Sequence, residues 1–241
     1  MLTWLIILLT TLAHAEFEIP TNLDSNDRQK TLEIIGLGTS TKFLSNSYPL
    51  GGYSGLEVSL SFEALDVEEI TQLGNTSPSH QTVFYPKINI GKGIFNNSDL
   101  FFHFIPFNET SGLSEYGFSF RWSFYQALFL PLNFSIITHA NSANVNNKIL
   151  ARNIGADLMM GLSLSDFSFF FGYGWTKSTG DFTGGSFGVT DTPSDPSNAR
   201  ISVNSSHFML GSTYSFDPFF IGASIDRYKN PVYSLKLGML F

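Results

Sequence analysis

The sequence predicts an all-β protein: a transmembrane, antiparallel, up-and-down β-barrel of about ten strands, preceded by a short N-terminal helical segment. Three observations lead to this fold class. Apolar and polar residues alternate over runs of about ten residues, the pattern of a barrel strand with two unlike faces. Charged residues make up only 14% of the 241 residues, whereas aromatic residues make up 15%. The chain also starts with an apolar stretch that is typical of an export signal.

The composition constrains both the environment and the partners of the protein. An ordinary soluble domain carries roughly 25% charged residues, so the value of 14% indicates that part of the surface contacts something other than water. The formal net charge of −7 argues against nucleic acid as a partner, since such binding needs clustered lysine and arginine. The chain contains no cysteine, so an exported form must be held together by strand pairing and packing alone.

Residues 1–15 are predicted to be a cleaved secretory signal peptide. This stretch is apolar and ends in Ala13-His14-Ala15, a small-x-small cleavage site directly before Glu16. A membrane-spanning helix needs about 20 apolar residues, and neither this run nor any later one is long enough. If the chain enters a membrane, it must therefore do so as strands.

Residues 16–51 are predicted to form a separate N-terminal segment. Ser25 or Asn26 is placed to cap a short helix over residues 27–35, which the next two glycines would end. A second helical turn over residues 41–44 is compatible with the sequence. The segment is either a lead-in outside the barrel or a plug folded into its lumen.

Residues 52–241 carry the barrel pattern. In the run 115–125, five aromatic residues form one face, and mainly glycine and serine form the other. Ten strands are predicted, at residues 53–65, 82–92, 99–107, 115–126, 129–140, 150–163, 166–177, 200–214, 218–227 and 232–241. The third and eighth runs alternate least clearly, so barrels of eight or twelve strands are also compatible with the sequence.

The two faces of these strands indicate which solvent each one meets. The polar face consists mainly of Ser, Gly, Asn and Thr, whereas a water-facing surface normally carries roughly 25–35% charged residues. The other face is rich in Phe and Leu, and aromatic residues such as Phe167, Tyr173 and Trp175 lie near strand ends, as in interfacial girdles. We therefore predict that the apolar face contacts lipid hydrocarbon and that the polar face lines the lumen.

The last strand carries five alternating apolar residues and ends on phenylalanine. These residues are Tyr233, Leu235, Leu237, Met239 and Phe241. The strand resembles the C-terminal assembly signal of Gram-negative bacterial outer-membrane β-barrel proteins, and the signal peptide and the alternation over residues 52–241 extend this resemblance to the class, though not to a subfamily. The resemblance implies periplasmic chaperones and the barrel-assembly machinery as partners during biogenesis. It also implies outer-membrane lipid and lipopolysaccharide as the surroundings of the mature protein.

The same resemblance implies an orientation. An even number of strands would place the N- and C-termini in the periplasm, and residues 16–51 would then be a periplasmic segment or a lumen plug. The two longest connections, at residues 66–81 and 177–199, would lie outside the cell, and the short turns would lie inside.

Charged residues on the predicted lumen face are the candidate functional residues. They are Glu57, Glu63, Lys87, Arg121, Asp157, Asp226 and Lys236, accompanied by His103, His139 and His207. Because a buried charge is costly unless it is paired, we expect these acids and bases to meet, and the closing seam to bring Lys236 to Glu57. The set is either a structural network that fills the lumen or a gate in a narrow pore.

The sequence favours an outer-membrane barrel without enzymatic activity, either a narrow passive channel or a structural and surface-contact protein. The alternative is a lipid-modifying hydrolase, of the phospholipase or lipid A deacylase type, that uses His139 and Ser142 as catalytic residues. Their spacing departs from the His-x-Ser-type motif of such enzymes and places the two side chains on opposite faces of a regular strand. The acidic loops lack the ligand spacing of a calcium loop. No metal, cofactor or particular oligomeric state is predicted.

Overall fold

The computed structural model describes residues 19–75, 82–95, 97–105, 112–192, 194–195 and 197–241. Ten antiparallel strands within them form a closed barrel, in which β1 closes against β10. The strands are β1 (Leu56–Asp66), β2 (Thr82–Phe95), β3 (Ser98–Ile105), β4 (Leu113–Gln126), β5 (Leu132–Val145), β6 (Ile149–Leu164), β7 (Phe167–Phe182), β8 (Ala199–Phe216), β9 (Phe219–Arg227) and β10 (Pro231–Leu240). The predicted fold class and strand number are confirmed. The predicted signal peptide, residues 1–15, lies outside the described residues.

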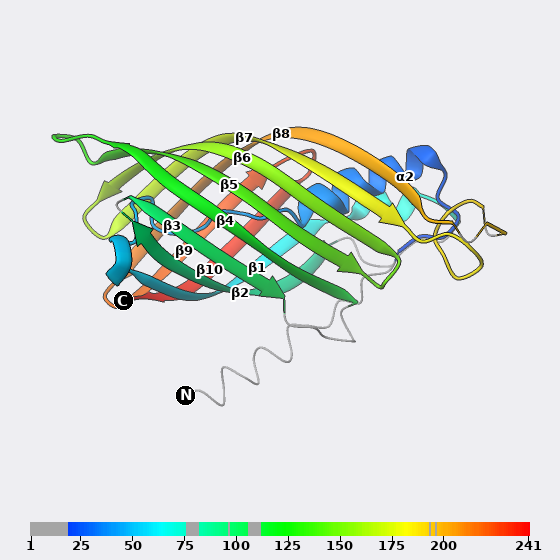
Figure 1. The fold of residues 1–241 in the computed structure, drawn as a ribbon, viewed down its shortest axis with the longest axis horizontal. Coiled ribbons are helices and arrows are strands. Elements are labelled where there is room, and N and C mark those ends of the chain that lie inside the picture. The colour runs from blue at the N-terminus through cyan, green and yellow to red at the C-terminus, as the bar shows by residue number, and fades with distance from the viewer. Residues whose placement is uncertain (1–18, 76–81, 96, 106–111, 193, 196) are drawn as a thin grey trace, which may run out of the picture.

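The two ends of the barrel differ in their connections (Figure 1). We call one of them the turn end, where the short connections at residues 127–131, 165–166 and 217–218 lie together with the C-terminus. The other is the loop end, which carries the long connections at residues 67–81 and 183–198. This segregation of long and short connections is the one expected for a barrel in an outer membrane.

Two strands extend farther toward the loop end than the sequence pattern predicts. β5 continues well past residue 140, and β7 continues well past residue 177, with unbroken pairing to β6. The outward side chains of these extensions are polar, as at Ser142 and Thr179. The hydrophobic alternation therefore stops before the strands do, and the connection between β7 and β8 is shorter than predicted.

The outer surface of the barrel is apolar over most of its height. On β4, outward-facing Tyr116, Phe118 and Phe120 are exposed, whereas inward-facing Ser119 and Arg121 are buried. The other strands repeat this alternation of exposed and buried residues. A continuous exposed apolar surface of this kind is foreign to a monomeric soluble protein, but it is the lipid-facing surface of a transmembrane barrel. No helix among the described residues has the length and apolarity to span a bilayer.

The interior of the barrel holds the N-terminal part of the described chain, which we call the inner segment (residues 19–50). It enters at the loop end, where helix α2 (Ser25–Thr31) continues into a π-helical turn (Leu32–Gly36). Residues 41–44 have no regular secondary structure, so the second helical turn considered from the sequence is not formed. This irregular part of the inner segment runs to the turn end, where a short 3-10 helix (Gly52–Ser54) leads into β1.

The helix differs from the sequence prediction at both of its ends. Asp24, which precedes the two predicted caps Ser25 and Asn26, is the actual cap, because its Oδ1 accepts a hydrogen bond from the backbone N–H three residues later (2.8 Å). Gly36 lies inside the π-helical turn and does not end the helix. A Cβ atom at this position would lie 2.3 Å from Ser178 Oγ of β7. The glycine therefore permits close packing of the helix against the barrel.

An apolar core fills the lumen at the loop end. The helix contributes Leu32, Ile34 and Ile35, all of which are fully buried. Inward-facing apolar residues of the strands surround them: Leu65, Val83, Ile105, Leu113, Val145, Ile149, Phe182, Val203 and Val232. Burial of a large aliphatic side chain contributes about 1.5–3 kcal/mol, so this core fixes the helix in the lumen.

The described chain thus begins at the loop end and finishes at the turn end. Ile19, the first described residue, packs in the loop-end core, whereas Phe241 pairs with Leu56 at the turn end. Residues 1–18 lie outside the described part, and the periplasmic location of the two termini stays a prediction.

Candidate functional site

The polar part of the lumen, between the apolar core and the turn end, contains the predicted charged residues. At the closing seam, Lys236 Nζ lies 2.6 Å from Glu57 Oε1, as predicted from the sequence. Lys236 also donates a hydrogen bond to the backbone oxygen of Leu44 (2.6 Å), and the hydroxyl of Ser45 donates one to Glu57. The inner segment therefore completes the environment of both charges.

Lys87 of β2 links two buried carboxylates. Its Nζ lies 3.0 Å from Glu63 Oε1 on β1 and 3.0 Å from Glu115 Oε2 on β4. His103 Nε2 lies 3.1 Å from the other oxygen of Glu115, and Lys42 of the inner segment lies 3.5 Å from Glu63 Oε2. All of these side chains are shielded from solvent. Because the charges compensate each other, the group is stable only as a complete network.

Arg121 is held between the barrel and the inner segment. Its Nε donates to Asp99 Oδ2 (2.8 Å) on the neighbouring strand β3, and another guanidinium nitrogen donates to the backbone oxygen of Asn46 (2.5 Å). The guanidinium lies 5.0 Å from the ring centroid of Phe43, within the range of a cation–π interaction. Asp99 also accepts a hydrogen bond from the backbone N–H of Leu50 (3.0 Å).

Asp157 lies between two histidines on the opposite side of the lumen. Its Oδ2 is 3.5 Å from His139 Nε2, and its Oδ1 is 3.2 Å from His207 Nε2. Asp226 accepts a hydrogen bond from Ser224 (3.3 Å) and, within the described part of the chain, forms no ion pair. The expectation that each lumen acid meets a base therefore fails at Asp226, because the nearby cations are engaged by other carboxylates.

Glycines on neighbouring strands make room for the lumen histidines. His103 is opposite Gly117 in the strand register, and His139 is opposite Gly155. A Cβ atom at Gly117 would lie 2.6 Å from the His103 ring, and one at Gly155 would lie 2.5 Å from the His139 ring. The small residues of the polar face thus let large side chains lie across the lumen.

Three charged members of these clusters were missed in the sequence. Glu115 has the same inward parity as Arg121 on β4, so its signal was available. Asp99 lies near the start of β3, where alternation is weak. Lys42 lies outside the strands, and its contact with Glu63 depends on the path of the inner segment, which strand periodicity does not reveal.

The His139 and Ser142 side chains do not form a catalytic pair. His139 points into the lumen and is buried, whereas Ser142 lies on the outward row of β5. The pairing of β5 with both neighbours is regular over these residues, so no bulge brings the side chains to one face. Among the described residues, no group of three or more His, Cys, Asp or Glu is arranged to hold a metal ion.

Ion pairs at the loop end tie the helix to the connections around it. Arg28 lies 2.8 Å from Asp191, and Lys229 lies 2.8 Å from Glu33. The hydrogen bond to Glu33 raises the pKa of Lys229. Partial burial acts to raise the pKa of Glu33, but hydrogen bonds from Lys229 and Gln29 outweigh it and leave this pKa below its ordinary value. Both members of the pair are therefore charged at neutral pH.

Most residues of the inner segment between Thr31 and Ser45 are buried. A cavity of about 20 Å³ lies beside residues 41–45, bounded by Asn89, Phe101 and Ser119 of the wall. This volume holds about one water molecule. The arrangement can therefore position buried charges and close the lumen.

Comparison with solved structures finds matches of low sequence identity. The N-terminal β-barrel domain of OprF from Pseudomonas aeruginosa is 13% identical, with a TM-score of 0.34 over 79% of this chain and 99% of that one. Ail, the attachment invasion locus protein of Yersinia pestis, is 13% identical, with a TM-score of 0.31 over 78% and 97% of the two chains. The KdgM porin is 8% identical, with a TM-score of 0.37 over 78% and 99%.

No curated protein sequence matches the chain. One family signature matches residues 14–241, which include the inner segment and the whole barrel. The protein therefore belongs to the family of unknown function DUF6588.

Proposed function

We propose that this protein is an integral β-barrel of the bacterial outer membrane whose lumen is closed by its own inner segment. It acts as a structural and surface-contact protein and not as an open channel. The observation that carries this proposal is the bonding of the inner segment to the barrel wall along the length of the lumen.

The membrane location is supported by the outer surface. The exposed apolar rows on the strands suit contact with lipid hydrocarbon, and closure of β1 on β10 gives each of the ten described strands two paired neighbours. A chain with 14% charged residues and this many exposed aromatic side chains is poorly suited to water.

The closed lumen is supported by contacts at successive heights. At the loop end, the helix packs in the apolar core. In the middle, Asn141 of β5 donates to the backbone oxygen of Thr39 (2.8 Å). Near the turn end, the Ser47 backbone N–H donates to Ser168 Oγ of β7 (3.2 Å). A barrel of about ten strands has a narrow interior, so one chain threaded through it blocks the path that a passive channel needs.

The loop end supports a role in surface contact. Leu23 forms a parallel bridge with Thr190 of the connection between β7 and β8, and Arg28 pairs with Asp191 of the same connection. With the turn end and Phe241 in the periplasm, this joined surface faces the cell exterior. The described chain, which starts at Ile19, then begins on the exterior side and not on the periplasmic side predicted from the sequence. The inner segment therefore closes the lumen and also braces the outer connections.

A cross-linking experiment combined with conductance tests the proposal. In this cysteine-free chain, Ser47→Cys with Ser168→Cys should form a disulfide in the folded barrel, because the two hydroxyls are hydrogen bonded. Ser47→Cys with Ser178→Cys is the control, since Ser178 lies about 33 Å farther along β7. The wild-type protein in planar bilayers should carry no current. Steady single-channel currents, or equal cross-linking of both pairs, would contradict the closed lumen.

A further inference from the structure

The outer face of the barrel is not uniform near the loop end. Above the apolar rows, the parts of β6, β7 and β8 nearest the loop end present Arg152, Lys177 and Arg200 outward. The side chains of Arg152 and Arg200 are 52% and 67% exposed. We call these three residues, together with Asn144 and Asp181, the upper wall.

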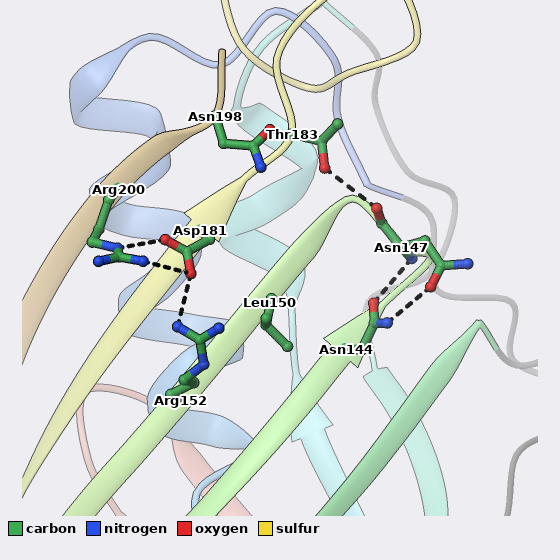
Figure 2. A pocket seen from close by; sticks show the side chains of 8 residues that line it. All are labelled: Asn144, Asn147, Leu150, Arg152, Asp181, Thr183, Asn198 and Arg200. Atoms are coloured by element: carbon green, nitrogen blue, oxygen red, sulfur yellow. Dashed lines mark hydrogen bonds and ion pairs between the residues drawn. The ribbon is translucent and has the colours of Figure 1, made fainter. Parts of the chain in front are cut away.

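Figure 2 shows that the two arginines of the upper wall converge on a single carboxylate. Arg152 lies 2.9 Å from Asp181 Oδ2, and Arg200 Nε lies 2.6 Å from Asp181 Oδ1. Arg152, Arg200, Asp181 and Asn144 surround a hollow of about 580 Å³, which is also lined by Asn198 and Thr183. Lys177 lies outside the hollow, two outward positions below Asp181 on β7. Because one aspartate balances only one of the two guanidinium groups, the hollow keeps an excess of positive charge, to which Lys177 adds.

The strand register fixes the height of this hollow relative to the membrane. Lys177 is paired with Ile154 of β6, and the next outward residue on β7 toward the turn end is Trp175, which is exposed. Tryptophan is enriched at the boundary between hydrocarbon and lipid headgroups. The upper wall therefore lies at the level of the headgroups, on the leaflet at the loop end.

We propose that the upper wall binds the phosphorylated headgroup of a glycolipid in the outer leaflet. A phosphate enters between Arg152 and Arg200, whose forked N–H donors match its oxygens, while Lys177 adds charge from below. The side-chain amides of Asn144 and Asn198 form hydrogen bonds with hydroxyl groups of the sugar. The acyl chains then descend over the apolar rows below.

Asp181 prepares the site for its ligand. It holds both guanidinium groups in place before the lipid arrives, which reduces the entropy lost on binding. Each arginine retains N–H donors beyond those that contact Asp181. The size of the hollow and its amide lining favour a sugar headgroup over a bare phosphate ion.

The test measures binding of lipid A to the folded full-length barrel in a neutral detergent by native mass spectrometry. Arg152→Gln with Arg200→Gln should weaken binding roughly 10- to 30-fold, since each surface cation contributes about 1 kcal/mol toward an anionic lipid. Lys92→Gln with Arg227→Gln is the matched control, because it removes the same charge from the turn end and from the end of β9, and neither residue lines the hollow. The control should bind lipid A as the wild type does.

Two further measurements distinguish the phosphate of a lipid headgroup from free inorganic phosphate. Dephosphorylated lipid A should bind at least about tenfold more weakly than lipid A, and inorganic phosphate at millimolar concentration should not displace the lipid. Equal binding of both lipids, or displacement by inorganic phosphate, would overturn the proposal. If the double variant does not fold, exposed Lys177→Gln replaces it, with an expected loss of about fivefold.

The inference rests on the membrane location proposed above, and the two fail in different ways. A wild-type chain that does not insert into lipid nanodiscs contradicts the membrane location. A chain that inserts, yet binds lipid A as well after Arg152→Gln and Arg200→Gln as before, contradicts only the headgroup site.

Discussion

Deletion of residues 19–50 should turn a silent barrel into an ion-conducting pore. The deleted residues fill the lumen with the helix at the loop end and with an irregular chain toward the turn end. Without them, water enters the space between the strands, and the polar residues of the turn-end half can solvate ions. Planar-bilayer recordings of the purified barrel should show single-channel currents that the wild type lacks.

A milder variant keeps this prediction testable if the deletion impairs folding. The deletion exposes inward-facing residues such as Leu65 and Phe182 to water, whereas replacement of residues 39–50 by a Gly-Ser chain of equal length leaves the helix and the apolar core in place. The replacement removes the bulk of Phe43 and Leu44 from the lumen. It should raise conductance as well. Two folded variants without any current would contradict the assignment of the inner segment as the closing element.

Replacement of Lys87 by methionine should lower the free energy of unfolding by about 3–5 kcal/mol, the cost typical of removing one partner from a buried ion pair. Methionine leaves Glu63 and Glu115 close together in the lumen, with their shared cation gone. The measurement is a urea titration of the barrel in lipid vesicles, followed by tryptophan fluorescence.

Two further variants identify the cause of the loss. Lys87→Met combined with Glu115→Gln should recover part of the stability, since only one of the two carboxylates is then left. Lys92→Met lies on the same strand at the turn end, where the side chain donates to the backbone oxygen of Tyr53, and it should change stability by less than about 1 kcal/mol. Equal effects of Lys87→Met and Lys92→Met would show that the network contributes little.

The barrel itself was predictable because one face of each strand meets lipid hydrocarbon and the other face meets the interior of the barrel. Period-two alternation gave the strand number and the inward parity of Lys236 and Glu57, and closure of the sheet then brought those charges together. The same pattern underestimated β5 and β7, because residues such as Ser142 and Thr179 face outward above the hydrocarbon. Strand pairing continues there, although the sequence no longer alternates between apolar and polar residues.

The placement of the inner segment was harder to predict, although a signal was present. At the loop end, inward positions such as Leu65, Val145 and Phe182 are apolar, which a water-filled lumen would not favour. The helix that carries Leu32 and Ile35 supplies the apolar contacts of these positions. By contrast, the contacts of Lys42, Ser45 and Asn46 depend on the path of an irregular chain, for which sequence periodicity carries no information.

The central claim is that the Phe- and Leu-rich rows face hydrocarbon while their neighbours face a filled interior. Spin labels at Leu158→Cys and Met159→Cys in lipid vesicles test it most directly, because Leu158 is 53% exposed and Met159 is fully buried. Molecular oxygen should reach the label at Leu158 and a water-soluble nickel complex should not, whereas the label at Met159 should be reached by neither. Nickel access at Leu158 equal to that at a label on Ser186, in the connection between β7 and β8, would contradict the account.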